Sequence, residues 1–381
     1  MDVTWHRHLS RIAKRYRCRY PIGIDIGQRH VYAAQIEDER NGLIVKGLFQ
    51  RAIGEAPDAS PDWDKEITAS LTQIRKSRQF RGKGAVVSLP SSDMLNFPIR
   101  IAVDPDRDVE EAIVEEAKKH LPYPVSEAII DYPSLGQVSS GKSGAYRATV
   151  VSVHRATLER YERIFRNAGL VLEAVDFNAS ALFRLYCRRQ PEPTGEVALA
   201  LIGRTETVLS VFSDGEILGH RSINWGLQTL GDKLMINFGH FKGAENTRSL
   251  LERYGLAYHY FNPRGGEEGS TASADQIDTM RAVAQVITPL VEELVHEFYK
   301  TFSYIRSEAT SILINKMCLY GAAAGVRRLD IFLAERLGLT TELIDPLSDG
   351  TLKMNRASAD GVGGSLYALA LGLAARRIPW L

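Results

Sequence analysis

The stretch Ile22-Gly23-Ile24-Asp25-Ile26-Gly27 decides the fold: it is an apolar run with one carboxylate in the middle and glycines on both sides. Isoleucine at alternate positions predicts a β-strand that can be buried on both faces. Asp25 is costly to bury unless it meets a cation, a metal ion or hydrogen-bond donors. Residues 22–27 therefore predict a buried strand whose carboxylate needs a partner. The plainer interpretation is a strand that ends in an Asx-type turn.

A tight turn follows this strand. Gly27 and the polar run Gln28-Arg29-His30 lead into a second apolar stretch, Val31–Ile36. In such a hairpin turn the backbone N–H groups can face an anion. A Rossmann fold or a P-loop needs a helix after its glycines, and neither glycine motif occurs in this stretch, so both nucleotide-binding motifs are excluded here.

Bulk composition indicates an ordinary globular protein. The chain has 381 residues, 44% of them hydrophobic and 24% charged, which predicts two or three domains. A net charge of +1 gives no argument for nucleic acid as a partner. The three cysteines are far apart and lack metal-site spacing, and no apolar run is long enough to cross a membrane. We expect a soluble intracellular protein that does not bind nucleic acid.

Residues 1–19 are strongly basic, with six lysines and arginines against Asp2 alone. Their apolar residues recur at spacings of three and four, which predicts a basic amphipathic helix. Such a helix docks on an anionic membrane surface or an acidic partner, or packs on its own domain. The sequence leaves these alternatives open.

The rest of the chain repeats one plan. Three strands, a helix and a strand are predicted up to Leu89, and three strands and a helix are predicted again over residues 196–238. The repetition predicts two α/β units that arose by duplication, with ligands in the cleft between them. Residues 92–172 interrupt the first unit with strand, helix, strand, strand, helix and strand.

A long apolar stripe lies further on, where apolar residues recur at alternating spacings of three and four positions from Ile277 to Ile305. This spacing predicts one long helix or two, with Pro289 as a kink. The stripe packs against its own unit or forms a coiled-coil dimer, so self-association stays an open alternative.

Specific motifs connect this plan to a known superfamily. Residues 23–27 match the first phosphate motif of actin-like ATPases, Val197–Gly203 lies where the second belongs, and Tyr320–Gly325 lies at the adenosine motif. The insert carries the most specific strings, which are Asn96-Phe97-Pro98-Ile99, Leu121-Pro122-Tyr123-Pro124, Ala168-Gly169-Leu170 and Val175-Asp176-Phe177. With these motifs the chain resembles the PilM-type family of type IV pilus assembly proteins, relatives of FtsA.

The resemblance implies an actin-like (ribonuclease H-like) fold, in which duplicated α/β domains carry an inserted small α+β subdomain of the FtsA/PilM kind. Residues 20–91 and 173–193 would form the first actin-like subdomain, and 92–172 the inserted partner-binding subdomain. Residues 194–381 would form the second, with a helical insertion at about 240–310.

The family pattern also implies a nucleotide site. Two hairpins hold the phosphates of ATP, each with a carboxylate that acts through Mg²⁺, and a glycine-rich turn admits the adenosine. The matching positions here are Asp25, Gly27, Gln28, Arg29, Gly203, Arg204, Thr205, Gly321, Ala322 and Ala323. Asp25 would be the Mg²⁺ ligand if ATP binds.

Three departures from this pattern favour a weakened or lost site. Leu201 or Ile202 takes the place of the second aspartate, alanines fill 322–324 where glycines are expected, and Leu251 replaces a nucleotide-facing lysine. Arg204 would then satisfy Asp25 as an ion pair, or else contact the phosphates of ATP directly. We expect no catalytic residue, and we interpret Asp176 as the cap of helix 178–188 rather than as a kinase base.

By resemblance, the protein is a cytoplasmic adaptor, peripheral to the inner membrane through its partners. It would bind the N-terminal cytoplasmic tail of a PilN-type membrane protein and connect to pilus motor ATPases. We expect the tail to add to an exposed strand edge near Met94–Ile101 or Tyr146–Val153. The alternatives are an active ATP-binding, ATP-hydrolysing switch of the same machinery, or a divergent FtsA-like division or type II secretion scaffold.

Overall fold

A computed structural model describes residues 21–39, 42–54, 61–103, 108–139, 144–191, 195–238, 244–260, 273–308, 312–354 and 363–377. The predicted basic helix at 1–19 lies outside these residues. The chain divides into two compact units. Unit 1 comprises Met1–Pro193, Asp214–His220 and Pro346–Leu381, and unit 2 comprises Thr194–Ser213 and Arg221–Asp345. The sequence places the segment after Pro346 in the second half, but in the structure it belongs to unit 1.

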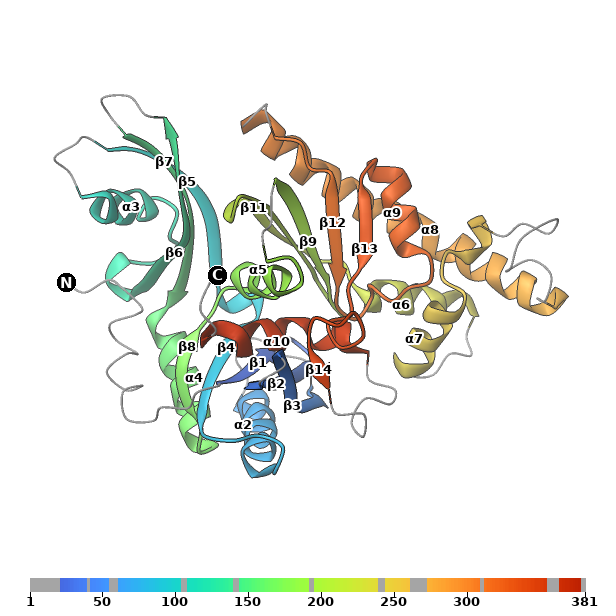
Figure 1. Cartoon of the computed structure of the whole chain (residues 1–381), viewed down its shortest axis with the longest axis horizontal. Coiled ribbons are helices and arrows are strands. Elements are labelled where there is room, and N and C mark those ends of the chain that lie inside the picture. The colour runs from blue at the N-terminus through green and yellow to red at the C-terminus, as the bar shows by residue number, and fades with distance from the viewer. Residues whose placement is uncertain are drawn as a thin grey trace. The chain divides into compact units, whose positions relative to one another are not determined.

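Unit 1 is built on a six-stranded sheet with strand order β14-β3-β2-β1-β4-β8 (Figure 1). Its strands are β1 (Ile22–Ile26), β2 (His30–Glu39), β3 (Gly42–Ala52), β4 (Gly84–Ser88), β8 (Val171–Val175) and β14 (Lys353–Met354). β1 pairs antiparallel with β2 and parallel with β4. The predicted buried strand at 22–27 is therefore the centre of a mixed sheet.

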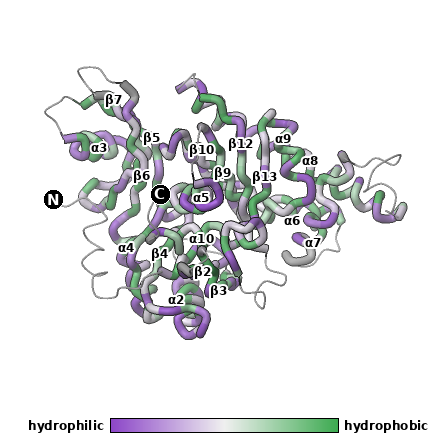
Figure 2. Tube along the Cα trace, in the orientation of Figure 1, coloured by the Kyte–Doolittle hydropathy of each residue, from purple (hydrophilic) through white to green (hydrophobic). Residues whose placement is uncertain are grey.

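Helices pack on this sheet because β1 is apolar on both faces. Ile22, Ile24 and Ile26 are fully buried, and on the other face Gly23 lets helix α10 (Ala368–Ala374) approach. A Cβ on Gly23 would lie 2.0 Å from the carbonyl oxygen of Ala370. α5 (Asn178–Arg189) packs against α10, and α2 (Pro61–Lys76) packs against α4 (Arg155–Asn167). Hydrophilic and hydrophobic residues alternate along α2 and α4, as amphipathic helices require (Figure 2).

Unit 2 repeats the central strand order of unit 1. Its sheet runs β11-β10-β9-β12-β13, matching β3-β2-β1-β4-β8 position by position. The strands are β9 (Glu196–Ile202), β10 (Thr207–Ser213), β11 (Glu216–Ile223), β12 (Lys316–Tyr320) and β13 (Thr340–Leu343). β11 belongs to this sheet by its pairing, although its residues up to His220 are grouped with unit 1. As in unit 1, the first strand pairs antiparallel with the second and parallel with the fourth.

The helices of unit 2 are α6 (Leu227–Phe238), α7 (Ala244–Arg253), α8 (Ala274–Glu308) and α9 (Leu329–Leu337). α8 is one helix of 35 residues with Pro289 inside it. Most of its apolar stripe is buried against its own unit, including Val283, Ile287 and Phe298. The ring N–H of Trp225 donates to the carbonyl of Leu290, next to this proline, at 2.8 Å. The stripe is thus used within the chain, which disfavours a coiled-coil seam along it.

The insert follows the predicted order from its first strand to its third. The predicted second helix and last strand, α4 and β8, are not part of it, because β8 pairs with β4 in the six-stranded sheet and α4 packs on α2 and β8. Strands β5 (Leu95–Val103), β7 (Gly144–His154) and β6 (Ala128–Ser139) form a three-stranded antiparallel sheet in that order, covered by α3 (Val109–Ala117). Its core includes Ile99, Ile113 and Val150. α3 begins at Val109, and the carboxylate of Asp108 caps it by accepting the Glu110 N–H at 2.9 Å.

Candidate functional site

The first predicted phosphate turn lies in unit 1 between β1 and β2. Its backbone closes where the N–H of Gly27 donates to the carbonyl of His30 at 2.9 Å. The carbonyl of Arg29 accepts the N–H of Ile53 at 2.8 Å, which fixes the turn to the end of β3. Gln28 and Arg29 are half-buried in this turn. The predicted hairpin is therefore confirmed as a short, closed turn.

Asp25 lies at the carboxyl end of β1 beside other polar residues. It stands in register with Ser88 of β4, and the Ser88 hydroxyl donates to the side-chain carbonyl of Asn178 at the start of α5. Parallel strands in open α/β sheets bind ligands at their carboxyl ends. Asp25, Ser88 and Asn178 thus form a polar edge in unit 1. The sequence reasoning missed Ser88 and Asn178, although a serine that closes the apolar run Gly84–Ser88 is a visible signal.

Asp176 lies in a buried ion-pair network and is not the cap of α5. The cap position of α5 is Phe177, which makes no side-chain cap hydrogen bond, so the predicted cap role of Asp176 is wrong. Its carboxylate instead pairs with Arg184 at 2.9 Å and with Arg376 at 3.0 Å. Burial raises the pKa of Asp176, but the two arginines and the N–H of Phe177, which donates to the carboxylate at 2.9 Å, together outweigh burial and hold the pKa below its ordinary value. A carboxylate held charged by two arginines is poorly suited to accept a proton.

The second predicted phosphate turn lies in unit 2 and has the same backbone geometry as the first. The N–H of Gly203 donates to the carbonyl of Glu206 at 2.8 Å, as Gly27 does to His30. The carbonyls of Gly203 and Arg204 accept the N–H groups of Leu227 and Gln228 at the start of α6, at 3.1 and 2.8 Å. Arg204 and Thr205 are half-buried at the tip of this turn. The turn therefore caps a helix with its carbonyls.

The predicted adenosine turn packs directly on this hairpin within unit 2. Gly321 has φ +98°, and a Cβ there would lie 2.5 Å from the carbonyl oxygen of Ile202. The N–H of Ala323 donates to the same carbonyl at 3.0 Å. Ala323 and Ala324 are buried and Ala322 is half-buried. Gly203, Arg204, Thr205, Gly321, Ala322 and Ala323 thus form one cluster, and glycine is kept only where the backbone requires it.

The position of the expected lysine is part of the core of unit 2. Leu251 on α7 is fully buried, and its carbonyl accepts the N–H of Arg327 at 3.0 Å. The carbonyl of Arg327 in turn accepts the N–H of Leu256 at 2.9 Å. Neither Leu201 nor Ile202 offers a carboxylate, and Ile202 is fully buried. Among the described residues, no group of three His, Cys, Asp or Glu side chains could hold a metal ion.

Asp25 and Arg204 belong to different units. The ion pair between them therefore stays a prediction.

Among the strands that the structure describes, the inserted sheet has one unpaired edge. β7 lies in the middle of the three strands, so the predicted free edge at Tyr146–Val153 is wrong. On the far side, β6 is engaged by the tip of the β10–β11 hairpin, where the hydroxyl of Ser134 accepts the N–H of Ile217 at 2.9 Å. β5 is the other edge of this sheet and contains Pro98, which is tolerated in edge strands. Of the two predicted edges, the one within Met94–Ile101 is available.

Residues 23–260 match the family model described as type IV pilus assembly protein PilM. The chain belongs to this PilM family. A solved PilM-PilN type IV pilus biogenesis complex is similar over 94% of this chain and 98% of that chain, with 19% identity and a TM-score of 0.70.

More distant structures share the fold of this PilM-family chain. The ethanolamine utilization protein EutJ from Carboxydothermus hydrogenoformans is 12% identical, with coverage of 93% of this chain and 89% of that chain and a TM-score of 0.52. The MreB 5 protein of Spiroplasma citri bound to AMPPNP is 14% identical, with 93% and 95% coverage and a TM-score of 0.50. The fold is therefore actin-like, as the resemblance implies. No described helix is both long and apolar enough to cross a bilayer.

Proposed function

We propose that the chain is an adaptor of the type IV pilus assembly machinery that binds the N-terminal tail of a PilN-type membrane protein along β5. The observation that supports this is the open edge of β5 in the inserted sheet. An extended peptide added to such an edge gains affinity from main-chain hydrogen bonds. Through this partner, the protein would lie at the cytoplasmic face of the inner membrane.

The register of β5 defines which of its amides a peptide would meet. Proline in an edge strand lies with its nitrogen toward solvent. Residues of β5 that are an even number of positions from Pro98 therefore direct their backbone N–H groups away from β7. Asn96 and Ala102 lie an even number of positions from Pro98, and Pro98 and Ala102 are exposed. We therefore infer that Asn96 and Ala102 present backbone N–H groups to which a partner strand pairs.

The nucleotide site is degenerate in this proposal. The two turns keep their backbone geometry, and Asp25 keeps one carboxylate. However, the second turn has no aspartate at 201 or 202, and a buried leucine stands where the lysine is expected. ATP would thus lose a Mg²⁺-directed carboxylate and one cationic contact. The rival is a protein in which Arg204 compensates, so that ATP binding switches partner affinity.

Calorimetric titration of the full chain with a synthetic N-terminal tail of the neighbouring PilN-type protein tests the partner proposal. Binding to the wild-type chain is expected, and Ala102→Pro should weaken it at least about tenfold by removing one outward N–H. Ala102→Ser is the matched control, because it leaves the backbone N–H donor in place and should bind like wild type. Equal affinity of all three chains would exclude the β5 edge.

A further inference from the structure

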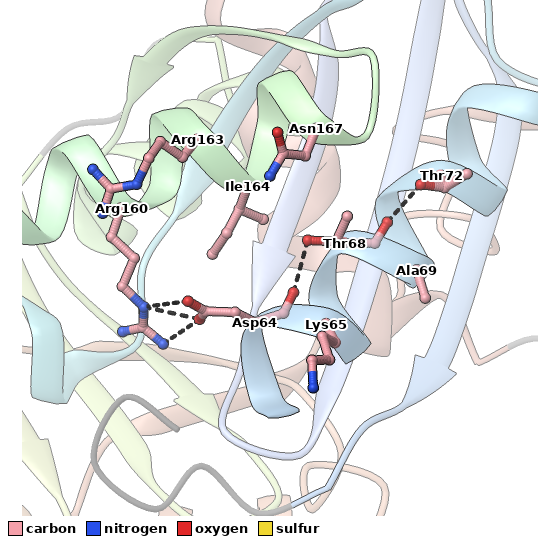
Figure 3. Close-up of a pocket in the computed structure, with 9 residues that line it drawn as sticks. All are labelled: Asp64, Lys65, Thr68, Ala69, Thr72, Arg160, Arg163, Ile164 and Asn167. Carbon is pink, nitrogen blue, oxygen red and sulfur yellow. Dashed lines mark hydrogen bonds and ion pairs between the residues drawn. The ribbon is translucent and has the colours of Figure 1, made fainter. Parts of the chain in front are cut away.

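A groove of about 560 Å³ lies between α2 and α4 of unit 1 (Figure 3). Neither predicted phosphate turn contributes a residue to its lining. Its lining comprises Asp64, Lys65, Thr68, Ala69, Thr72, Arg160, Arg163, Ile164 and Asn167. A space of this size is within the range of protein ligand sites. No residue proposed for PilN-type or nucleotide binding lies among them.

One end of the groove is held rigidly. The Nε of Arg160 lies 2.8 and 3.0 Å from the two carboxylate oxygens of Asp64, joining α4 to α2. The guanidinium of Arg160 also lies 5.1 Å from the ring of Trp63 and 5.7 Å from that of Tyr161. The Tyr161 hydroxyl donates to Asp93 at 2.6 Å, which fixes that ring. The groove is thus formed before any partner arrives.

The α2 side of the groove is poor in free hydroxyl donors. The hydroxyls of Thr68 and Thr72 donate to backbone carbonyls one turn earlier in α2, both at 2.7 Å (Figure 3). Their hydroxyl protons are therefore already used. Ile164 points from α4 into the space between the helices, and Ala69 is exposed on α2. This surface suits an aliphatic side chain better than a phosphate, which needs several donors.

The rim is cationic. Arg163 is exposed and makes no ion pair with the residues that the structure describes, whereas Lys65 pairs with Asp62 at 2.9 Å. α2 and α4 run in the same direction, because Asp64 meets Arg160 while Arg75 lies near Gly169 further along. At that end the exposed Lys76 and Arg166 continue the positive charge. Glu162 of α4 is not part of the lining.

We propose that this groove binds an acidic, aliphatic-bearing peptide segment of a second partner protein. An aliphatic side chain packs over Thr68 and Ala69 beside the small exposed part of Ile164, and flanking carboxylates meet Arg163 and the basic end of the groove. From Asp64 to Thr72 the helix rises about 12 Å, which matches about four extended residues. A membrane surface shares the charge preference but is flat, so it does not use the concave surface.

Selection from a displayed library of random 12-residue peptides against the full chain tests the proposal. Peptides rich in Asp, Glu and aliphatic residues are expected to be enriched. Ala69→Trp fills the groove and should abolish their binding, and Arg163→Glu should weaken it at least about tenfold, which corresponds to about 1.4 kcal/mol. Gln73→Trp and Arg155→Glu are matched controls on exposed positions of α2 and α4 outside the lining, and each should bind within twofold of wild type.

Three results would overturn the proposal. The first is a selection that enriches no acidic peptides. The second is enriched peptides that bind the Ala69→Trp chain as tightly as wild type or lose affinity equally with Arg155→Glu. The third is binding of anionic phosphatidylglycerol vesicles that depends on Arg163 while the selected peptides do not bind, which would assign the surface to lipid. Unchanged melting temperatures of all four variants establish that the fold is intact; if Ala69→Trp unfolds, Ala69→Glu replaces it, and its added charge should repel the acidic peptides.

Discussion

Replacing Asp176 with asparagine should strongly destabilise unit 1. The carboxylate is 6% exposed and pairs with Arg184, which is itself 7% exposed and also donates to the carbonyl of Gly372 at 2.6 Å. Removing the negative charge leaves the buried guanidinium of Arg184 without its counter-charge. The cost of breaking a buried ion pair in this way is about 3–5 kcal/mol. With an m-value of about 3 kcal/mol/M in urea, the unfolding midpoint falls by roughly 1–1.7 M.

Urea unfolding of the full chain followed by circular dichroism measures this change. Asp64→Asn is the matched control, because the side chain of Asp64 is 30% exposed in its pair with Arg160, and its loss should cost about 1 kcal/mol or less. Adding Arg184→Met to Asp176→Asn should cost little more, because the uncompensated charge is then gone. Equal midpoints for the Asp176→Asn and Asp64→Asn chains would refute the reasoning.

Four further predictions concern the pH dependence of Asp176, the packing of Gly23, the buried Leu251 and the binding of ATP. The difference in free energy of unfolding between wild type and Asp176→Asn should be largest above about pH 4 and should shrink as the pH falls further. The reason is that the pKa of Asp176 is lower in the folded chain than in the unfolded chain. A constant difference from pH 6 to 2 would contradict this. Gly23→Ala should lower the free energy of unfolding in urea by about 3 kcal/mol or more, because the added Cβ would clash with α10. Gly338→Ala is the control, since its Cβ would contact no atom and only the positive φ of Gly338 would disfavour alanine. Leu251→Lys should lower the melting temperature and fail to create ATP-dependent stabilisation, since it buries a charge in the core. Millimolar ATP with Mg²⁺ should leave the melting temperature of wild type unchanged, and a rise that Asp25→Ala removes would instead support the ATP-binding rival.

Local patterns in the sequence predicted the two sheets well. The alternation in β1 and the glycines around it specify a central strand and a closed turn, and the repeated strand order predicts the duplication that both sheets show. These signals are local, so they can be seen without the fold.

Features that depend on distant partners were not predictable. The role of Asp176 is set by Arg184 on α5 and by Arg376, which is 200 residues away in sequence. The central place of β7 depends on strand order, which spacing alone does not give. The groove between α2 and α4 likewise needs two helices that are about 90 residues apart to pack side by side.

The most direct test of the adaptor account compares three forms of the PilN-type tail peptide in calorimetric titrations with the full chain. One form is unmodified, and the other two are N-methylated at alternate residues, one in each register, so that the methylated amides cannot pair with an edge strand. The account predicts that the unmodified peptide binds and that one methylated register loses at least about tenfold in affinity while the other is little affected. Equal affinity for all three peptides would contradict pairing along β5, and with it the proposed mode of partner binding.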